Sequence, residues 1–371
     1  MRTITHEQLD DIAMGAAVLG TGGGGDPHIG KLLAQQALKK HGPVTMIDVT
    51  ELDDEAMAAA SAMMGAPTVM VEKIPRGEEV IEAFQRLQEF MGRKLDATFS
   101  AEAGGLNSTI PFVVAATLGI PLVDVDMMGR AFPELQMGTP TMYGISATPM
   151  AIADEKGNSS ILNTINNTWT ETFARTVTID MGCSAMIACY PMTGKQLKET
   201  AVARTITLNE TIGRTIRESH QQHLDPIESV RGAVDGFIIW HGKVSDIARR
   251  TETGFARGTA TIAGVGEYAG RELLVDFQNE FLIARDSDGQ VLVSTPDLIT
   301  MLDAETGEPI TTEALRYGFR VAVLALKCDP RWRSQAGLDL VGPAYFGYEA
   351  EYVPVENRFG NGAPNQEGSN D

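Results

Sequence analysis

Three acidic side chains follow apolar stretches of this sequence at points where strands would end. Glu102 follows the segment 95–101, and Asp124 and Asp126 follow the next apolar run. Residues two apart on a strand point the same way, so Asp124 and Asp126 could present both carboxylates to one point. Such a pair can hold a divalent metal, or one member can act as general base with the other as its partner. The structural alternative is that one of the two caps a helix or pairs with Arg130.

A glycine-rich stretch offers a second kind of chemistry. Residues 20–27 read Gly-Thr-Gly-Gly-Gly-Gly-Asp-Pro, and five of these eight lack a side chain, so the backbone can bend sharply and approach a ligand closely. Its Asp-Pro end is typical of a helix start, where free amides and the helix dipole suit an anionic or strongly polar ligand. A flexible hinge between two helices is the alternative. We expect substrate to be bound here by Gly22, Gly23, Gly24, Gly25 and Asp26.

This stretch does not match a standard nucleotide site. Gly20, Gly22 and Gly25 fit the spacing G-x-G-x-x-G, but that pattern indicates dinucleotide binding only after a strand. The preceding segment 5–19 has helical periodicity instead, and no Gly-Lys-Ser/Thr follows. A phosphate- or nucleotide-dependent enzyme that uses the loop stays open as a further alternative.

A second loop of the same kind lies further along the chain. Gly104, Gly105 and Asn107 stand just ahead of a predicted helix at 109–118. In open α/β sheets, ligands collect beyond the carboxyl ends of the strands. We therefore expect both loops to lie at one sheet edge, with these three residues binding substrate and Arg130 anchoring a substrate carboxylate.

The elements that would position these residues alternate between helix and strand in the first half of the chain, which implies parallel β-α units. After Pro226 the pattern becomes β-rich. The sequence thus predicts an α/β fold: an N-terminal α/β domain with a mostly parallel sheet (1–165), a β-rich C-terminal domain with a helical entry (166–357), and a disordered tail (358–371). In the first domain we expect helices at 5–19, 27–40, 76–93 and 109–118 and strands at 43–49, 95–101 and 120–125, with 56–64 ambiguous.

The second domain is expected to begin with a long helix over 159–180, a strand at 184–190 and a helix at 206–223. His241 and Gly242 are predicted to form the turn of a hairpin. In that position His241 could reach across a domain interface as an acid or base, or be an ordinary turn residue. The hairpin strands are 233–240 and 243–250, followed by strands at 258–263, 271–277, 281–285, 290–294 and 319–326.

The composition of the chain limits the classes of molecule that the protein could bind. The net charge of −19 argues against nucleic acid and anionic membrane surfaces, while a small-molecule substrate remains compatible with it. Three cysteines are too few for a disulfide framework, and no signal peptide or membrane-length apolar run is present in the sequence. We expect a soluble cytoplasmic protein, and a homo-oligomer on the general habit of such enzymes.

The order of these stretches resembles the S-methyl thiohydantoin desulfurase family, which is associated with hydantoinase and oxoprolinase. The resemblance implies hydrolytic removal of sulfur from a thiohydantoin ring, leaving a hydantoin, and it implies that 56–63 is a strand. The similar stretches cover nearly the whole chain: 20–27, 64–67, 72–73, 102–107, 119–126, 129–134, 254–258, 276–280, 342–343 and 346–348.

Two functions remain open from the sequence. The first is a hydrolase in which Asp124, Asp126 or Glu102 activates water, directly or through one divalent metal at Asp124 and Asp126. The glycine-loop amides would then hold the oxygen or sulfur where negative charge develops. The second is a binding or accessory subunit of a hydantoinase- or oxoprolinase-type system, which the lack of any standard catalytic motif favours.

Overall fold

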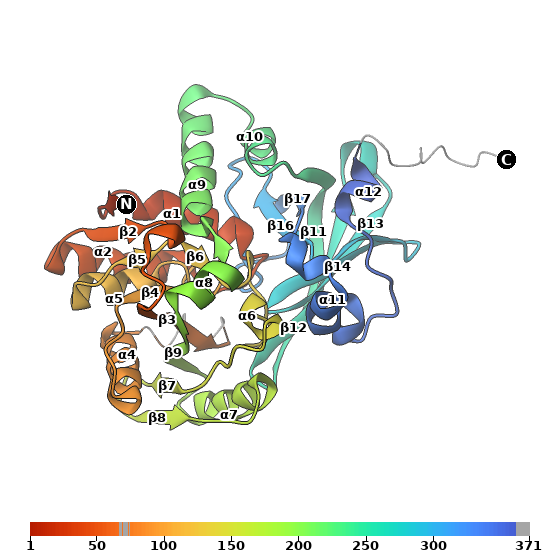
Figure 1. Cartoon of the computed structure of the whole chain (residues 1–371). Helices are drawn as coiled ribbons and strands as arrows, with labels where there is room; N and C mark the ends of the chain where they lie inside the picture. The colour runs from red at the N-terminus through yellow and green to blue at the C-terminus, as the bar shows by residue number, and fades with distance from the viewer. Residues whose placement is uncertain (67–68, 70–72, 74, 361–371) are drawn as a thin grey trace.

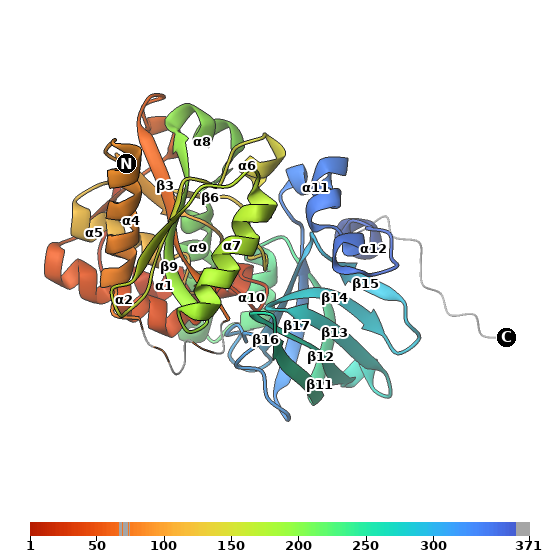
Figure 2. The same cartoon turned by 90° about the horizontal axis from the view of Figure 1, so that it is seen from below.

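The computed structural model describes residues 1–66, 69, 73 and 75–360. Of the disordered tail predicted at 358–371, the part from 361 onward lies outside them, but Arg358 and Phe359 belong to helix α12 (Val355–Phe359), so the predicted start of the tail is wrong. An α/β part and a β part lie side by side in both views (Figures 1 and 2). The α/β part is built on an eight-stranded sheet, here called sheet A. In spatial order its strands are β1 (Arg2–Ile4), β2 (Val44–Ile47), β5 (Leu122–Val123), β4 (Ala97–Ser100), β3 (Met57–Gly65), β9 (Ser184–Thr193), β7 (Met150–Ala153) and β8 (Ser159–Leu162).

The β part is a seven-stranded sheet, here called sheet C, in which every pairing is antiparallel. A two-stranded ladder of β6 (Val125–Asp126) and β10 (Val202–Ala203) stands apart from both sheets. The strands of sheet C, in spatial order, are β15 (Val291–Ser294), β14 (Glu280–Asp286), β13 (Glu272–Gln278), β12 (Phe255–Gly264), β11 (Phe237–Glu252), β17 (Arg320–Leu326) and β16 (Leu298–Asp303).

Most helices belong to the α/β part. None of the helices in the described ranges combines the length and the apolar character needed to cross a bilayer. The helices are α1 (Leu9–Leu19), α2 (Pro27–His41), α4 (Glu78–Met91), α5 (Ile110–Leu118), α6 (Thr139–Met142), α7 (Asn167–Asp180), α8 (Gly194–Thr200), α9 (Thr205–Gln222), α10 (Pro226–Ala233), α11 (Gln335–Val341) and α12 (Val355–Phe359).

The pairing of strands confirms the predicted fold class. At the centre of sheet A, β2, β5, β4 and β3 run parallel to one another. Antiparallel strands extend this centre at both edges: β1 on one side and β9, β7 and β8 on the other. Strand β9 lies beyond the expected boundary at residue 165 and nevertheless pairs with β3 of the first half.

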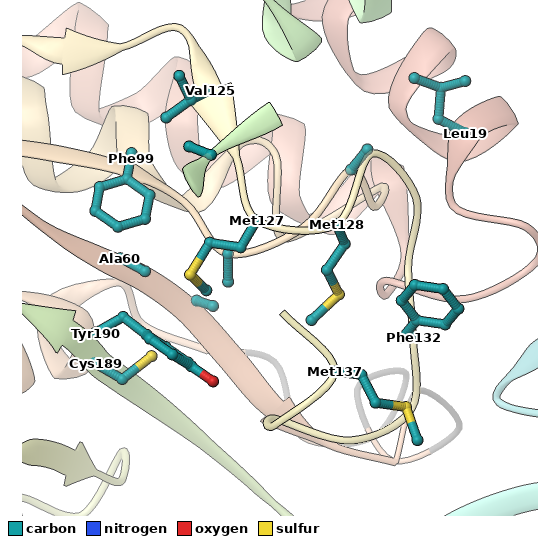
Figure 3. Packing of buried hydrophobic residues seen from close by; sticks show 14 of the residues in the cluster. Leu19, Ala60, Phe99, Val125, Met127, Met128, Phe132, Met137, Cys189 and Tyr190 are labelled. Atoms are coloured by element: carbon teal, nitrogen blue, oxygen red, sulfur yellow. The ribbon is translucent and has the colours of Figure 1, made fainter. Parts of the chain in front are cut away.

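Strand β3 explains how an alanine-rich segment forms the middle of a sheet. Successive side chains of a strand point to opposite faces, and both faces of β3 are covered. Its even-numbered residues 58–64 pack in a core with side chains of α7 and α8, and its Met57, Ala59 and Met63 pack in another with α4 and α5. The first of these cores continues into β17 of sheet C, so the two parts share it; Figure 3 shows some of its side chains.

Three predicted elements are wrong. The segment 159–180 is not one helix, because β8 pairs with β7 and α7 begins only after Asn166, whose side chain caps it. The apolar segment 120–125 divides at Asp124 into β5 and β6, which belong to different sheets. The hairpin around His241 does not exist: β11 runs without a turn from Phe237 to Glu252, and His241 pairs with Ala322 of β17.

Gly242 has a different role from the one predicted. Its backbone does not need a left-handed conformation, but a methyl group there would come within 2.5 Å of the Ala263 carbonyl oxygen on β12. The glycine therefore permits close approach of two strands rather than a turn.

Candidate functional site

A pocket lies where the carboxyl ends of β3 and β4 meet the short connection between β13 and β14. Its volume is about 70 Å³. This is room for roughly five water molecules, which suits a small ring. The side chains and backbone that line it come from both parts of the molecule: Gly24, Gly25, residues 62–65, Ala101, Glu102, Asn107, Met128, residues 132–135, Glu171, Arg175, Ile187, Asn279 and Glu280.

The sequence predicted that the two glycine-containing loops lie at one sheet edge, and in the structure they pack directly on each other beside this pocket. A methyl group on Gly24 would come within 2.3 Å of the Gly104 Cα atom, and Gly24 adopts a positive φ of 75°. The Gly24 carbonyl accepts hydrogen bonds from the Leu106 and Asn107 amides at 2.9 and 3.2 Å. The glycines are thus needed for backbone-to-backbone contact, and of the six predicted loop glycines only Gly24 and Gly25 line the pocket.

Several backbone amides predicted to bind substrate are used inside the protein. The Gly23 amide donates to the Gly20 carbonyl, and the Gly104 amide donates to Ser108 Oγ. Asp26 closes the start of α2, because its carboxylate accepts from the next free amides, those of residues 28 and 29. The helix cap at Asp26 is confirmed, whereas the anion site expected at this helix end is already filled by the Asp26 carboxylate.

Glu102 follows the end of β4, as predicted, and it lines the pocket. Its Oε1 accepts from the side-chain amide of Asn107 at 2.6 Å, and its Oε2 accepts from the Phe132 backbone amide at 3.3 Å. Asn107 is held in turn by two hydrogen bonds to the backbone of Met63 on β3. Burial raises the pKa of Glu102 to about 7, although these hydrogen bonds and the nearby Arg130 act against the shift.

Glu280 is the residue that the sequence alone did not single out. It starts β14, directly after Asn279, and only 3% of its surface is exposed. A methyl group on Gly23 would come within 2.0 Å of Glu280 Oε1, so the glycine loop lies against this carboxyl group. Glu280 Oε2 is buried and has no hydrogen-bond partner among the described residues. Burial, and then the charge of Glu102, raise the pKa of Glu280 well above its usual range.

Arg130 is fully buried and cannot anchor a substrate carboxylate, contrary to the prediction. An arginine side chain has five N–H donors, and each of the five donates to an acceptor within the protein. The acceptors are the carbonyls of Ala131, Phe281, Pro296 and Asp297 and the hydroxyl of Thr21. Arg130 therefore ties the glycine loop to sheet C beneath the pocket, and its positive charge lowers the pKa of the nearby carboxyls.

Asp124 and Asp126 have separate partners. The Asp124 carboxylate accepts from the amide and the hydroxyl of Thr207 near the start of α9, which is the helix-capping alternative. Asp126 Oδ1 accepts from the amides of Met128 and Gly129 at 2.7 and 2.6 Å. Burial raises the pKa of Asp126 to about 7, yet neither aspartate lines the pocket.

The geometry offers no metal centre within the described residues, where no group of three or more histidine, cysteine, aspartate or glutamate side chains is arranged around one point. His241 lies on β11 with its ring centroid 6.4 Å from that of Tyr268, and it does not line the pocket. Of the predicted catalytic residues, Glu102 lines the pocket, whereas Asp124, Asp126 and His241 do not.

Comparison with known proteins finds two family models whose boundary lies within the α/β part, since β9 falls in the second model but belongs to sheet A. A family model described as "S-Me-THD-like, N-terminal domain" matches residues 7–164, and one described as "S-Me-THD-like, C-terminal domain" matches residues 165–355. The chain belongs to the S-Me-THD-like family. A crystal structure of a protein from Chromobacterium violaceum is similar to it, with a TM-score of 0.80 and 24% identity over 96% of this chain and 100% of that one. A comparison with curated proteins gives no match.

The pocket of this S-Me-THD-like chain joins the two family domains. Glu102 belongs to the N-terminal domain, and Glu280 belongs to the C-terminal one. Glu171 and Arg175 of α7 also line the pocket, and their side chains form a buried ion pair with an N–O distance of 2.7 Å. Glu280 starts a strand directly after Asn279, whose backbone has a positive φ of 59°. The sequence does not reveal this conformation, so it gave no signal for Glu280.

Proposed function

We propose that this protein is a hydrolase that removes sulfur from a small thiohydantoin-like ring. The observation that supports this best is a single small pocket into which each family domain brings one buried carboxyl group, Glu102 and Glu280. Burial raises the pKa of both acids and the charge of Glu102 raises that of Glu280 further, so the pair can share one proton, with one member serving as base and the other as acid at the same pH. Family membership supports the choice of substrate.

The two groups would take different roles. Glu102 accepts two N–H hydrogen bonds, which favour its ionised form, so it is the base; Glu280 Oε2 has no partner among the described residues and burial raises the pKa of Glu280, so it is the acid. In the reaction, water loses a proton to Glu102 as its oxygen bonds to the ring carbon that carries sulfur. Glu280 then protonates the sulfur, which leaves as hydrosulfide, and the proton of the new hydroxyl returns to Glu280 as the ring carbonyl forms.

The surroundings suit this chemistry. The pocket is small and largely apolar around the acids, with Met128 and Phe132 among its walls, so it favours a compact ring over bulk water. The backbone at Gly24 and Gly25 borders it and can approach the substrate closely. Asn107 fixes the orientation of Glu102, and it acts as a positioning residue rather than a catalytic one.

The test is sulfide release from 2-thiohydantoin by the purified chain, compared with Glu102→Gln and Glu280→Gln. We expect both variants to lose turnover by about 100-fold or more, the usual contribution of general acid–base catalysis. Glu313→Gln is the matched control, because Glu313 is also buried with a pKa raised to about 7 but lies outside the pocket. The wild-type rate should fall at both low and high pH, where the pair holds two protons or none.

Each outcome separates the alternatives. Equal turnover in the wild type and Glu102→Gln would remove Glu102 from the mechanism. If 2-thiohydantoin binds the wild type in calorimetry but no sulfide appears, the protein is a small-ligand-binding or accessory subunit and the hydrolase proposal is wrong.

A further inference from the structure

A second concavity lies on sheet C, away from the pocket of Glu102 and Glu280. It has a volume of about 450 Å³, is formed across β11, β12 and β13, and shares no lining residue with the first pocket. Its walls include two aromatic residues that follow α11, Phe346 and Tyr348. We call it the arginine groove, because Arg249, Arg250 and Arg257 all line it.

The charge of this groove opposes that of the whole chain. The protein has a net charge of −19, yet three arginines line the groove, and Asp276 is the only acidic residue among the described residues that line it. Asp276 is itself neutralised by an ion pair with Arg285. A local cluster of one sign in a concave surface attracts ligands of the other sign despite the global charge.

The three arginines are not equivalent. Arg249 is used structurally, since its guanidinium donates to the carbonyls of residues 312, 313 and 315. Arg250 forms an ion pair with Glu252 that is largely exposed, with 75% of the arginine side chain accessible. Arg257 makes no hydrogen bond or ion pair with any described residue, and its Nε atom is buried without a partner. Its guanidinium carbon lies 5.7 Å from the centroid of the Phe255 ring.

A buried amide adds a second independent observation. Gln278 at the end of β13 is only 7% exposed and lines the same groove. Its Nε2 atom is buried and has no hydrogen-bond partner within the described part of the chain. A buried N–H group without an acceptor is destabilising, and Arg257, which pairs with Gln278 across the two strands, leaves a second such donor. Both groups are donors, so a ligand that satisfies them must bring acceptor oxygens.

We propose that the arginine groove binds a small organic oxyanion, a carboxylate or a phosphate monoester, whose oxygens accept from Arg257 and Gln278. Guanidinium groups recognise both kinds of oxyanion through two parallel hydrogen bonds. The rings of Phe346 and Tyr348 supply an apolar wall for the organic part of the ligand. This site is distinct from the hydrolase pocket and does not depend on the reaction proposed there.

The test is calorimetric titration of the full chain with benzoate and with phenyl phosphate, in a low-salt cationic buffer. We expect saturable one-to-one binding of at least one probe with a Kd below about 1 mM. Arg257→Gln should weaken it about tenfold or more, the effect of losing a charge-assisted hydrogen-bonded pair. Arg250→Gln is the matched control, and it should change the Kd less than about threefold because its charge is exposed.

The two probes distinguish a carboxylate site from a phosphate site, and either result supports the proposal. Arg257→Lys keeps the charge without the planar fork and tests the same site if the glutamine variant does not fold; it should weaken binding less than Arg257→Gln does, but measurably. The proposal is overturned if neither probe binds the wild type, or if Arg257→Gln and Arg257→Lys bind as tightly as the wild type.

Discussion

Replacing Arg130 by lysine tests whether this side chain joins the two parts of the molecule. The guanidinium donates five hydrogen bonds to five buried acceptors, and a lysine ammonium has only three donors. At least two acceptors therefore lose their partner in Arg130→Lys. Each buried, unsatisfied polar group costs about 1–3 kcal/mol, so the free energy of unfolding should fall by about 2–6 kcal/mol.

The measurement is urea unfolding of the wild type and the variant at neutral pH, followed by fluorescence and circular dichroism. Arg217→Lys serves as the matched control, because Arg217 pairs with Asp11 on the surface, where such pairs contribute about 0–1 kcal/mol. A loss in Arg130→Lys no larger than that in Arg217→Lys would refute the reasoning. It would mean that the five contacts do not hold the glycine loop against sheet C.

Two further predictions concern the pocket. Burial raises the pKa of Glu102 to about 7, so the folded protein keeps a proton that the unfolded chain loses near pH 4.5, and stability falls as the pH rises between these values. Glu102→Gln removes this dependence. Between pH 5 and pH 7 the free energy of unfolding, measured with urea, should therefore fall less steeply in the variant than in the wild type, by on the order of 1 kcal/mol per pH unit. Parallel curves of stability against pH would contradict the assigned burial. Gly24→Ala should be more destabilising than Gly119→Ala in thermal melts, although both glycines have positive φ, because a methyl group collides with Gly104 at the first site and meets nothing within 4 Å at the second. Equal losses would show that the two loops can separate at little cost.

The local parts of the fold were predictable from the sequence, because short-range chemistry determines them. Asp26 and the proline after it begin α2 in the expected way, and the hydrophobic periodicity of 76–93 marks α4. Glu102 was placed correctly because a polar residue after a buried parallel strand lies at the edge where ligands collect. The alanines of β3 required the family resemblance, since their small size suits either a helix or a strand covered on both faces.

The rest depends on contacts between distant segments. Asp124 and Asp126 do not share a face because the chain leaves one sheet for another ladder between them, and no local pattern marks that change. Arg130 seemed available for a ligand, but three of its five acceptors belong to residues 151 to 167 positions further on. Glu280 could not be recognised as part of the site until the fold placed it against Gly23.

The position of Arg130 also affects how the protein is made. During synthesis Arg130 emerges well before Phe281 and Asp297, which are 151 and 167 residues later. At about 5–20 residues per second, this delay is on the order of ten seconds or longer. For that interval three of the five acceptors of the Arg130 guanidinium have not yet been translated, so the N-terminal half cannot complete its packing on the ribosome. We therefore expect the first family domain to need protection from aggregation until the second has been synthesised, and a gene split between the two to give halves that must be produced together.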